Sequence, residues 1–204
     1  MRRIACLAMG ALLTMTGAAF AQGGPGGGGQ PVGIAAGLQT SYNRIKNLVT
    51  QSADKLSDAD YAFKPVNEIR SYGQLWGHVA NFHYNTCAQV KGVANPNQGN
   101  NLENTATTKA QVVKALADSF AFCDDAFAAL TDQTAVEMLQ GGRGGPRAKL
   151  VVLNQIVEHD NEMYGIGTVY QRLKGVVPPS TEAQQNRGGG AGRQGGGGQG
   201  GRGN

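Results

Sequence analysis

The chain has 204 residues, which is enough for one domain of ordinary size with a sizeable core. Of its 32 glycines only 13 lie between residues 30 and 186, so a collagen-like or wholly disordered chain is excluded. The net charge of +4 also comes from the ends, because the middle of the chain carries 13 basic and 14 acidic residues. This balance argues against nucleic-acid binding by the folded part.

Residues 1–21 have the pattern of a secretory signal peptide. Two arginines open the segment, an apolar run follows, and Ala19 and Ala21 fit a cleavage site after Ala21. The apolar run is too short to remain across a bilayer, and no later stretch approaches the ~20 apolar residues that a span needs. We therefore expect an exported chain, periplasmic or secreted, without a membrane span after cleavage.

Residues 22–32 and 183–204 are expected to be disordered. The first segment reads as a Gly-rich flexible linker and the second as a tail of Gly, Arg and Gln, and neither has enough apolar residues to offset the entropy of ordering. The Arg-Gly spacing of the tail is superficially similar to RNA-binding segments, but the tail has no aromatic residue for stacking on bases. We interpret the tail as a solvated tether.

Four segments between these ends carry apolar residues at helical spacing. They run from Ile34 to Leu56, from about Ser71 to Lys91, from about Thr108 to Thr131 and from about Arg147 to Leu173. The connections are polar or glycine-rich, and no run with a period of two residues competes. Four helices of about 20 residues predict an all-α fold, a four-helix bundle over residues 33–182.

The three histidines are candidates for chemistry. His159 occupies the apolar stripe of the fourth helix, and His78 lies at the edge of the stripe of the second. Two histidines that project inward from different helices would begin a metal site, because neutral imidazole is a common ligand for zinc, nickel and similar ions. The same spacing also fits two core histidines that neighbouring Asn or Tyr side chains satisfy. His83 faces about 140° away from His78 and is expected at the surface or on a second face.

Two cysteines, Cys87 and Cys123, remain after removal of the signal peptide. Each lies on the apolar stripe of a helix, and the two helices are consecutive. An exported compartment favours oxidation of thiols. We predict an intramolecular disulfide between them, with two buried free thiols as the alternative.

Two motifs in this chain resemble the DinB-like family, in its exported bacterial branch. The first is YAFKP at residues 61–65 followed by IRSYGQLWGHVA at residues 69–80. The second is LNQIVEHDNEMYG at residues 153–165, with YQRLKGVVPP at residues 170–179 closing the fourth helix. The resemblance extends over about residues 33–180, which is nearly the whole folded part.

The resemblance implies an antiparallel-type four-helix bundle, often a homodimer, with a metal ion held by one histidine of the second helix and two of the fourth. His78 and His159 match the first two ligand positions, whereas Met163 stands at the third. A thioether is a weak ligand for zinc and suits Cu(I) better. Three interpretations stay open: a lost site, a weakened site completed by Glu162 or water, and a site that includes the thioether.

Two functions are therefore compatible with the sequence. The first is a metal-dependent hydrolase or transferase for an unidentified small-molecule substrate, in which Zn, Ni or Mn, with Cu less favoured, activates water or a thiol. The second is a non-catalytic exported bundle, a stress-associated or binding protein that holds no metal ion. No Gly-x-Ser-x-Gly elbow or Walker-type phosphate loop competes with these two.

Overall fold

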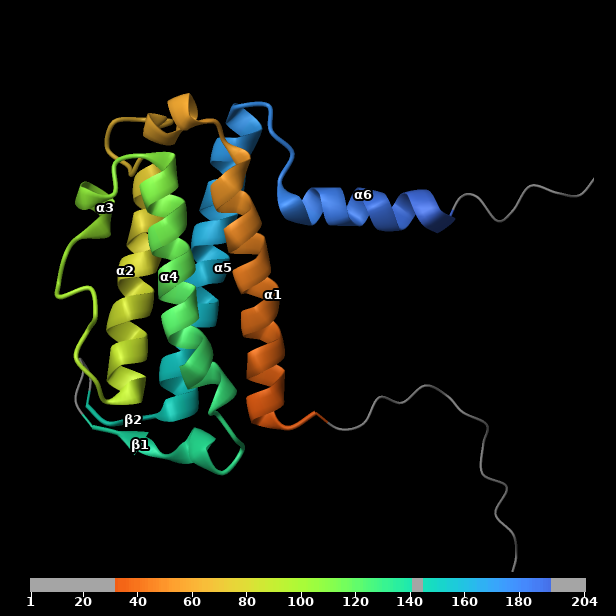
Figure 1. The fold of residues 1–204 in the computed structure, drawn as a ribbon. Helices are drawn as coiled ribbons and strands as arrows, with labels where there is room; N and C mark the ends of the chain where they lie inside the picture. The colour runs from red at the N-terminus through yellow and green to blue at the C-terminus, as the bar shows by residue number, and fades with distance from the viewer. Residues whose placement is uncertain (1–31, 141–144, 192–204) are drawn as a thin grey trace, which may run out of the picture. The chain divides into compact units, whose positions relative to one another are not determined.

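The structure, a computed structural model, describes residues 32–140 and 145–191 (Figure 1). The signal peptide expected at residues 1–21 and nearly all of the expected linker therefore lie outside the described residues. The elements in chain order are α1 (Ile34–Lys55), the 3₁₀ helix η1 (Asp58–Ala62), α2 (Tyr72–Lys91), α3 (Leu102–Thr105), α4 (Lys109–Ala128), the 3₁₀ helix η2 (Thr134–Val136), β1 (Met138–Leu139), β2 (Arg147–Ala148), α5 (Lys149–Leu173) and α6 (Pro179–Ala191). The long helices α1, α2, α4 and α5 form the predicted bundle.

Local sequence signals set the ends of α2 and α4. Ser71 caps α2: its hydroxyl accepts the N–H of Gln74, and the amide oxygen of Gln74 accepts the N–H of Ser71. Thr108 and Gln111 form the same reciprocal pair at the start of α4. These capping boxes satisfy backbone donors that the first helical turn leaves unpaired. Gly92 ends α2 in the left-handed conformation, with φ +65°, which glycine adopts without steric cost.

The four long helices are not all antiparallel to their neighbours. α1 and α2 each pack against both α4 and α5. α2 and α4 run in the same direction, since a disulfide joins Cys87 and Cys123, which both lie toward the C-terminal ends of their helices. α1 and α5 are also parallel, because Gln171 donates to the backbone oxygen of Ser52 near the C-terminal end of each. The expected antiparallel arrangement holds only for the α1–α4 and α2–α5 pairs.

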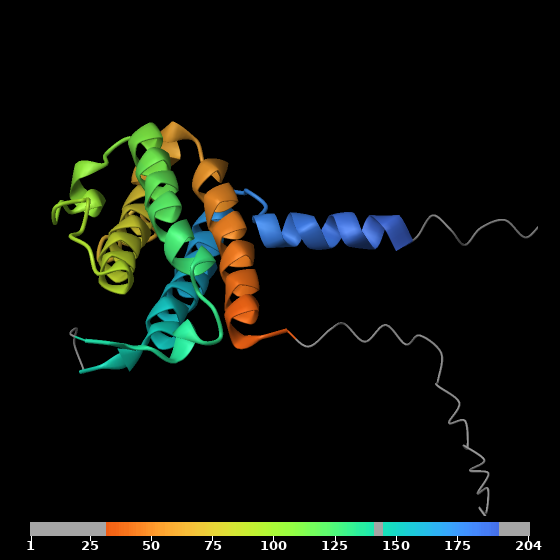
Figure 2. The same cartoon turned by 60° about the horizontal axis from the view of Figure 1, so that its bottom comes forward.

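The segment between Gly92 and Thr108 makes the parallel α2–α4 pair possible. A helix of 20 residues is about 30 Å long, and an extended segment of this length can return along it. The segment runs back beside α2 and carries the short helix α3 (Figures 1 and 2). A Cβ atom on Gly77 of α2 would lie 2.8 Å from the backbone oxygen of Leu102, so only glycine permits α3 to approach this closely.

The short strands β1 and β2 lie at the end of the bundle where α4 finishes and α5 begins (Figure 2). They pair antiparallel, with Met138 opposite Ala148 and Leu139 opposite Arg147. The sequence gives no strand signal here because each strand has only two residues.

Most residues of the predicted apolar stripes form the core, but Ile34, the first residue of the first stripe, is 53% exposed. In the C-terminal half of α5, Ile166 and Leu173, which the helical spacing predicts inside, are 37% and 58% exposed. The buried face in this half of the helix contains Gly167, whose position lies against the indole ring of Trp76. Glycine contributes no hydrophobic signal, so the apolar spacing predicted Ile166, and not the neighbouring Gly167, on the buried face of α5.

The C-terminal helix α6 corrects the expected extent of the tail. Residues 183–191 are helical, although the sequence predicted disorder from residue 183 onward. Pro179 occupies the first helical position, where its missing N–H has no cost, and Glu182 pairs with Lys55 of α1 at 2.5 Å. The rest of the tail lies outside the described residues. Within the part of the chain that the structure describes, no helix is both long and apolar enough for a membrane crossing.

Candidate metal centre at His78 and His159

His78 lies on α2, and its ring is held by charged side chains from outside that helix. Its Nδ1 is 2.7 Å from Oε1 of Glu103 in α3, and Oε2 of Glu103 accepts a hydrogen bond of 2.8 Å from Nε of Arg70. Nη2 of Arg70 also lies 3.2 Å from Nδ1 of His78. Nδ1 cannot serve both neighbours, because it must carry a hydrogen to donate to Glu103 and must lack one to accept from Arg70. The shorter contact, to Glu103, assigns the hydrogen to Nδ1 and leaves the lone pair on Nε2.

The electrostatic surroundings keep His78 neutral and Glu103 ionised. Partial burial lowers the pKa of His78, and Arg70 acts in the same direction, although the hydrogen bond to Glu103 opposes them. Burial would raise the pKa of Glu103, but hydrogen bonds to Arg70 and His78 outweigh burial and lower it. A neutral imidazole with a free Nε2, backed by a carboxylate at Nδ1, is the form in which histidine binds metal ions.

His159 lies on α5, and its ring faces that of His78 across the helix pair. The two ring centroids are 5.0 Å apart, and the His159 ring stacks on Phe82 at 4.0 Å with an interplanar angle of 15°. Both ring nitrogens of His159 are buried and have no hydrogen-bond partner among the described residues. Oδ1 of Asp160 lies 3.7 Å from Nδ1, which is beyond hydrogen-bonding distance.

The unpaired nitrogens of His159 are costly for the folded protein. A buried polar atom without a partner costs about 1–3 kcal/mol. The alternative interpretation of His78 and His159, as core histidines satisfied by Asn or Tyr, therefore does not describe His159. A ligand that accepts the imidazole lone pair would remove this cost.

The third ligand position expected from the sequence contains Met163, which is 5% exposed and lies one turn after His159. Glu162, the other side chain considered as a ligand, is exposed to solvent. Among the described residues, no three His, Cys, Asp or Glu side chains gather closely enough to hold a metal ion. Of the expected ligand set, the structure brings together the two imidazole rings, with Met163 one turn further along α5.

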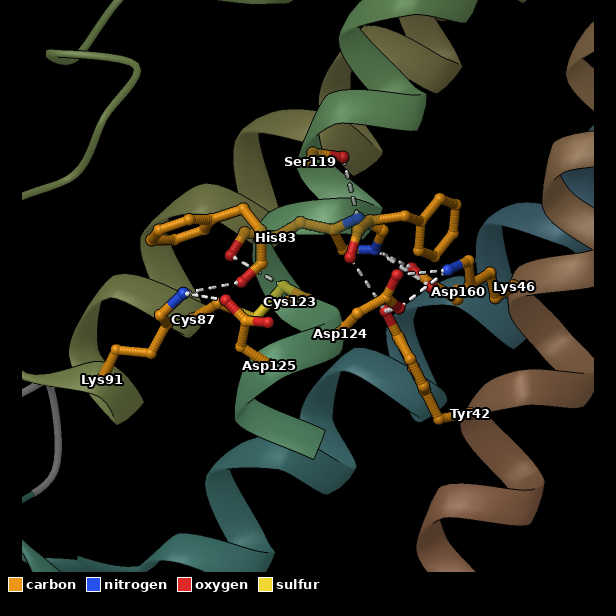
Figure 3. The surroundings of a disulfide bond; sticks show 12 residues. Tyr42, Lys46, His83, Cys87, Lys91, Ser119, Cys123, Asp124, Asp125 and Asp160 are labelled. Carbon is orange, nitrogen blue, oxygen red and sulfur yellow. Dashed lines mark hydrogen bonds and ion pairs between the residues drawn. A yellow bond between two sulfur atoms is a disulfide. The ribbon is translucent and has the colours of Figure 1, made fainter. Parts of the chain in front are cut away.

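Of the two places expected for His83, the surface is wrong and the second face is right, because this side chain is fully buried. Its Nε2 lies 2.9 and 3.0 Å from the two carboxylate oxygens of Asp160, and its Nδ1 lies 3.1 Å from Oγ of Ser119. Figure 3 shows these three residues between α2, α4 and α5. The face of α2 that carries His83 is an interior face, because α2 packs against α4 as well as α5.

Hydrogen bonds connect His83 to both neighbouring helices. The hydroxyl of Ser119 donates to the backbone oxygen of Leu116 at 2.8 Å and contacts Nδ1 of His83. Nε2 of His83 faces both carboxylate oxygens of Asp160. Burial would raise the pKa of Asp160, but the charge of His83 and hydrogen bonds outweigh burial and lower it.

Cys87 and Cys123 form the disulfide that the sequence predicts, with Cα atoms 5.4 Å apart. It lies beside the buried His83 pair, as Figure 3 shows. Nearby, the hydroxyl of Tyr42 donates to Asp124, which also accepts from Lys46. Burial raises the pKa of Tyr42, with Asp124 acting in the same direction. The disulfide and these polar pairs join α2, α4 and α5 with α1.

Sequence reasoning did not find the side chains that support the histidines. Glu103 comes from a polar, Asn-rich connection with no motif, so its contact with His78 carries no sequence signal. Asp160 and Ser119 lie at helix positions that hydrophobic periodicity treats as breaks in the pattern. Arg70 stands inside the first motif, and its position just before the capping Ser71 was the available signal.

Comparisons with known proteins agree with the fold. The sequence model of the DinB superfamily matches residues 42–165. Among curated proteins, none matches the chain.

Solved structures with similar folds cover about two thirds of this chain. A DinB-like protein from Bacillus cereus has a TM-score of 0.59 at 16% identity, with 70% of this chain and 94% of that chain covered. A conserved protein from Enterococcus faecalis has a TM-score of 0.57 at 13% identity, covering 70% and 98%. A DinB-like protein from Bacillus subtilis has a TM-score of 0.52 at 20% identity, covering 68% and 92%. At these identities the likeness concerns the fold alone.

Proposed function

The chain belongs to the DinB superfamily, and from this premise we propose that it binds a divalent metal ion through His78 and His159. The activity we propose is that of a metal-dependent hydrolase or transferase acting on a small molecule. The single observation that carries the proposal is that both ring nitrogens of His159 are buried without a hydrogen bond. The centroid of this ring lies 5.0 Å from the centroid of the His78 ring.

The two imidazoles fit a metal ion, and the third donor fits it less well. Nδ1 of His78 is engaged by Glu103, which leaves Nε2 as the donor, while His159 offers a nitrogen with no other partner. Met163 supplies a thioether, which zinc, nickel and manganese bind weakly. We therefore expect the site to bind Zn²⁺ or Ni²⁺ more weakly than a site with three imidazoles would.

A divalent ion bound by these residues would supply Lewis-acid activation of a water or thiol by lowering its pKa. The chain's own contribution is to orient the two rings. Glu103 holds His78 in the tautomer with a free Nε2, and Phe82 fixes the plane of His159 by stacking. Met163 and Phe82 give the centre an apolar border.

A metal titration of the full chain tests this proposal. Zn²⁺ binding, followed by isothermal titration calorimetry, should be stoichiometric in the wild type and absent in His159→Ala and His78→Ala. Glu158→Ala is the matched control on α5, because this exposed carboxylate accepts a hydrogen bond from Asn154, and its loss should leave the affinity unchanged. Wild-type protein that rebinds no Zn²⁺, Ni²⁺, Mn²⁺ or copper tighter than micromolar would contradict the proposal.

One observation favours the second candidate, a non-catalytic bundle. Met163 stands at the third ligand position expected from the sequence, and catalytic zinc sites usually have three strong protein ligands. Protein with no metal affinity at any of its histidines would support this second function.

We propose in addition that the chain is exported, as the residues at its N-terminus predict. The disulfide between Cys87 and Cys123 is compatible with an oxidising compartment. Mass spectrometry of the protein recovered from the periplasm or medium should show cleavage after Ala21. Recovery of the uncleaved chain from the cytoplasm would contradict export.

A further inference from the structure

A pocket of about 620 Å³ is lined by residues that contact His78 and by a residue one turn after His159. Arg70 and Glu103 line it and also contact His78. Met163, one turn after His159, lines it from α5. The complete lining is Glu68, Ile69, Arg70, Leu75, Glu103, Met163, Ile166 and Tyr170. Its volume lies within the usual ~300–1,000 Å³ of small-molecule pockets.

The pocket walls are mainly apolar. Leu75, Met163 and Tyr170 are buried, whereas Ile69 and Ile166 are 40% and 37% exposed. Large aliphatic side chains that line a pocket and remain partly open to water favour a ligand with an apolar body, because the ligand would remove this surface from water.

The charged residues of the pocket carry an excess negative charge. Arg70 and Glu103 pair at 2.8 Å and compensate each other. Glu68 is exposed and makes no ion pair with any described residue. The pocket therefore presents one uncompensated carboxylate beside its apolar walls.

We propose that this pocket binds a small amphipathic cation, an amine attached to an aromatic or branched apolar group. The apolar group would lie against Ile69, Ile166 and Leu75, and the ammonium would lie on the side of Glu68. The proposal that the amine binds depends only on the lining of the pocket. The further step, that such an amine is the substrate, rests on the proposed metal-dependent function.

An anionic ligand fits the pocket less well than an amine. Nε of Arg70 already donates to Glu103, and its Nη2 lies 3.2 Å from His78. The hydroxyl of Tyr170 donates to the backbone oxygen of Arg70 and is not free to bind an anion. A carboxylate ligand would also be repelled by the uncompensated carboxylate of Glu68, and repulsion of this kind produces specificity.

Three probes of similar size and different charge test the proposal: 2-phenylethylamine, 2-phenylethanol and 3-phenylpropanoate. Their binding to the full, metal-free chain is measured by NMR titration at low salt. Each step in charge at a partly exposed site should change affinity about threefold, so the amine should bind roughly tenfold more tightly than the carboxylate. Equal binding of the three probes, or tighter binding of the carboxylate, would overturn the proposal.

Two variants locate the binding in this pocket. Glu68→Gln should weaken amine binding about threefold and leave binding of the alcohol unchanged. Glu158→Gln is the matched control, since it makes the same change of charge on α5 outside the pocket lining. Ile166→Lys, at a partly exposed position, should abolish amine binding with no loss of helicity. Equal effects of Glu68→Gln and Glu158→Gln would overturn the assignment to this pocket.

The metal titration separates this inference from the proposed function. Amine binding in protein that binds no metal would support the pocket and contradict the enzyme. Metal binding in protein that takes none of the three probes would overturn the pocket and leave the metal centre intact.

Discussion

His83 and His159 lie in the same bundle, yet the protein treats their imidazoles in opposite ways. His83 is fully buried, and both of its nitrogens have protein partners, Asp160 and Ser119. The ring nitrogens of His159 are also buried, but neither makes a hydrogen bond, and the nearest carboxylate oxygen, that of Asp160, lies 3.7 Å from Nδ1. The difference shows that burial alone does not tell whether the fold itself satisfies an imidazole. The protein supplies both hydrogen-bond partners of His83 and neither one for His159, which is why we propose His159, and not His83, as a metal ligand.

The largest effect should come from breaking the buried pair. Removing one partner of a buried ion pair costs about 3–5 kcal/mol because the other charge stays buried and uncompensated. His83→Gln should lower the free energy of unfolding by this amount in urea denaturation. The same change at the other histidine, His159→Gln, should cost about 1 kcal/mol or less, because no protein hydrogen bond is lost. Equal losses would contradict the distinction between the two histidines.

The disulfide beside His83 should be nearly as important. Its cysteines are 36 positions apart, and closing a loop of this length stabilises the fold by on the order of 3–4 kcal/mol. The double change Cys87→Ala and Cys123→Ala should lower the free energy of unfolding accordingly. Thiol counting on denatured, unreduced mature protein, which lacks Cys6, should find no free thiol. Two free thiols per chain would show that the bridge does not form.

Glu103, which contacts Nδ1 of His78, allows a sharper test of the proposed metal site. Glu103→Gln removes the carboxylate behind Nδ1 and should weaken Zn²⁺ affinity about 10- to 100-fold, as losses of such supporting carboxylates do. Glu137→Gln is the control: it removes an exposed carboxylate that pairs with Lys149 away from the centre. If both variants bind Zn²⁺ as the wild type does, His78 is not a ligand.

The smallest predicted change is a gain. Met163→His would place an imidazole one turn after His159 and complete a set of three. Zn²⁺ affinity should rise at least tenfold, about 1.4 kcal/mol. Calorimetry that shows no gain would mean that the surroundings of residue 163 no longer suit a third ligand. Met163→Leu, which keeps the volume but removes the sulfur, separates the effect of packing from that of the donor.

Much of the fold could be predicted from the sequence because its signals are local. Apolar residues at helical spacing mark the four long helices, and Cys87 and Cys123 on two consecutive stripes indicate the disulfide. The parallel orientation of α2 and α4 could not be predicted, because no sequence pattern indicates whether the long connection between them turns back along α2. Gly167 against Trp76 escaped prediction for a similar reason: the absence of a side chain has no hydrophobic signal.

The candidate centre was predictable only in part. His78 and His159 were found from their motifs and spacing. Their environment depends on Glu103, which is 25 positions from His78 in the chain, and this contact exists only in the folded bundle. For His83 the spacing left two places open, the surface or a second face of the helix, and the contacts of α2 with both α4 and α5 select the second face.

The central claim is that His159 and His78 each have a ring nitrogen available to bind a metal ion, whereas both ring nitrogens of His83 are occupied by protein partners. NMR of the three imidazoles, with ¹⁵N in the rings, tests it in one titration with Zn²⁺. We predict that the ring nitrogen signals of His78 and His159 shift together and saturate, while those of His83 stay unchanged. Shifts at His83, or no shift at His159 at millimolar Zn²⁺, would contradict the account.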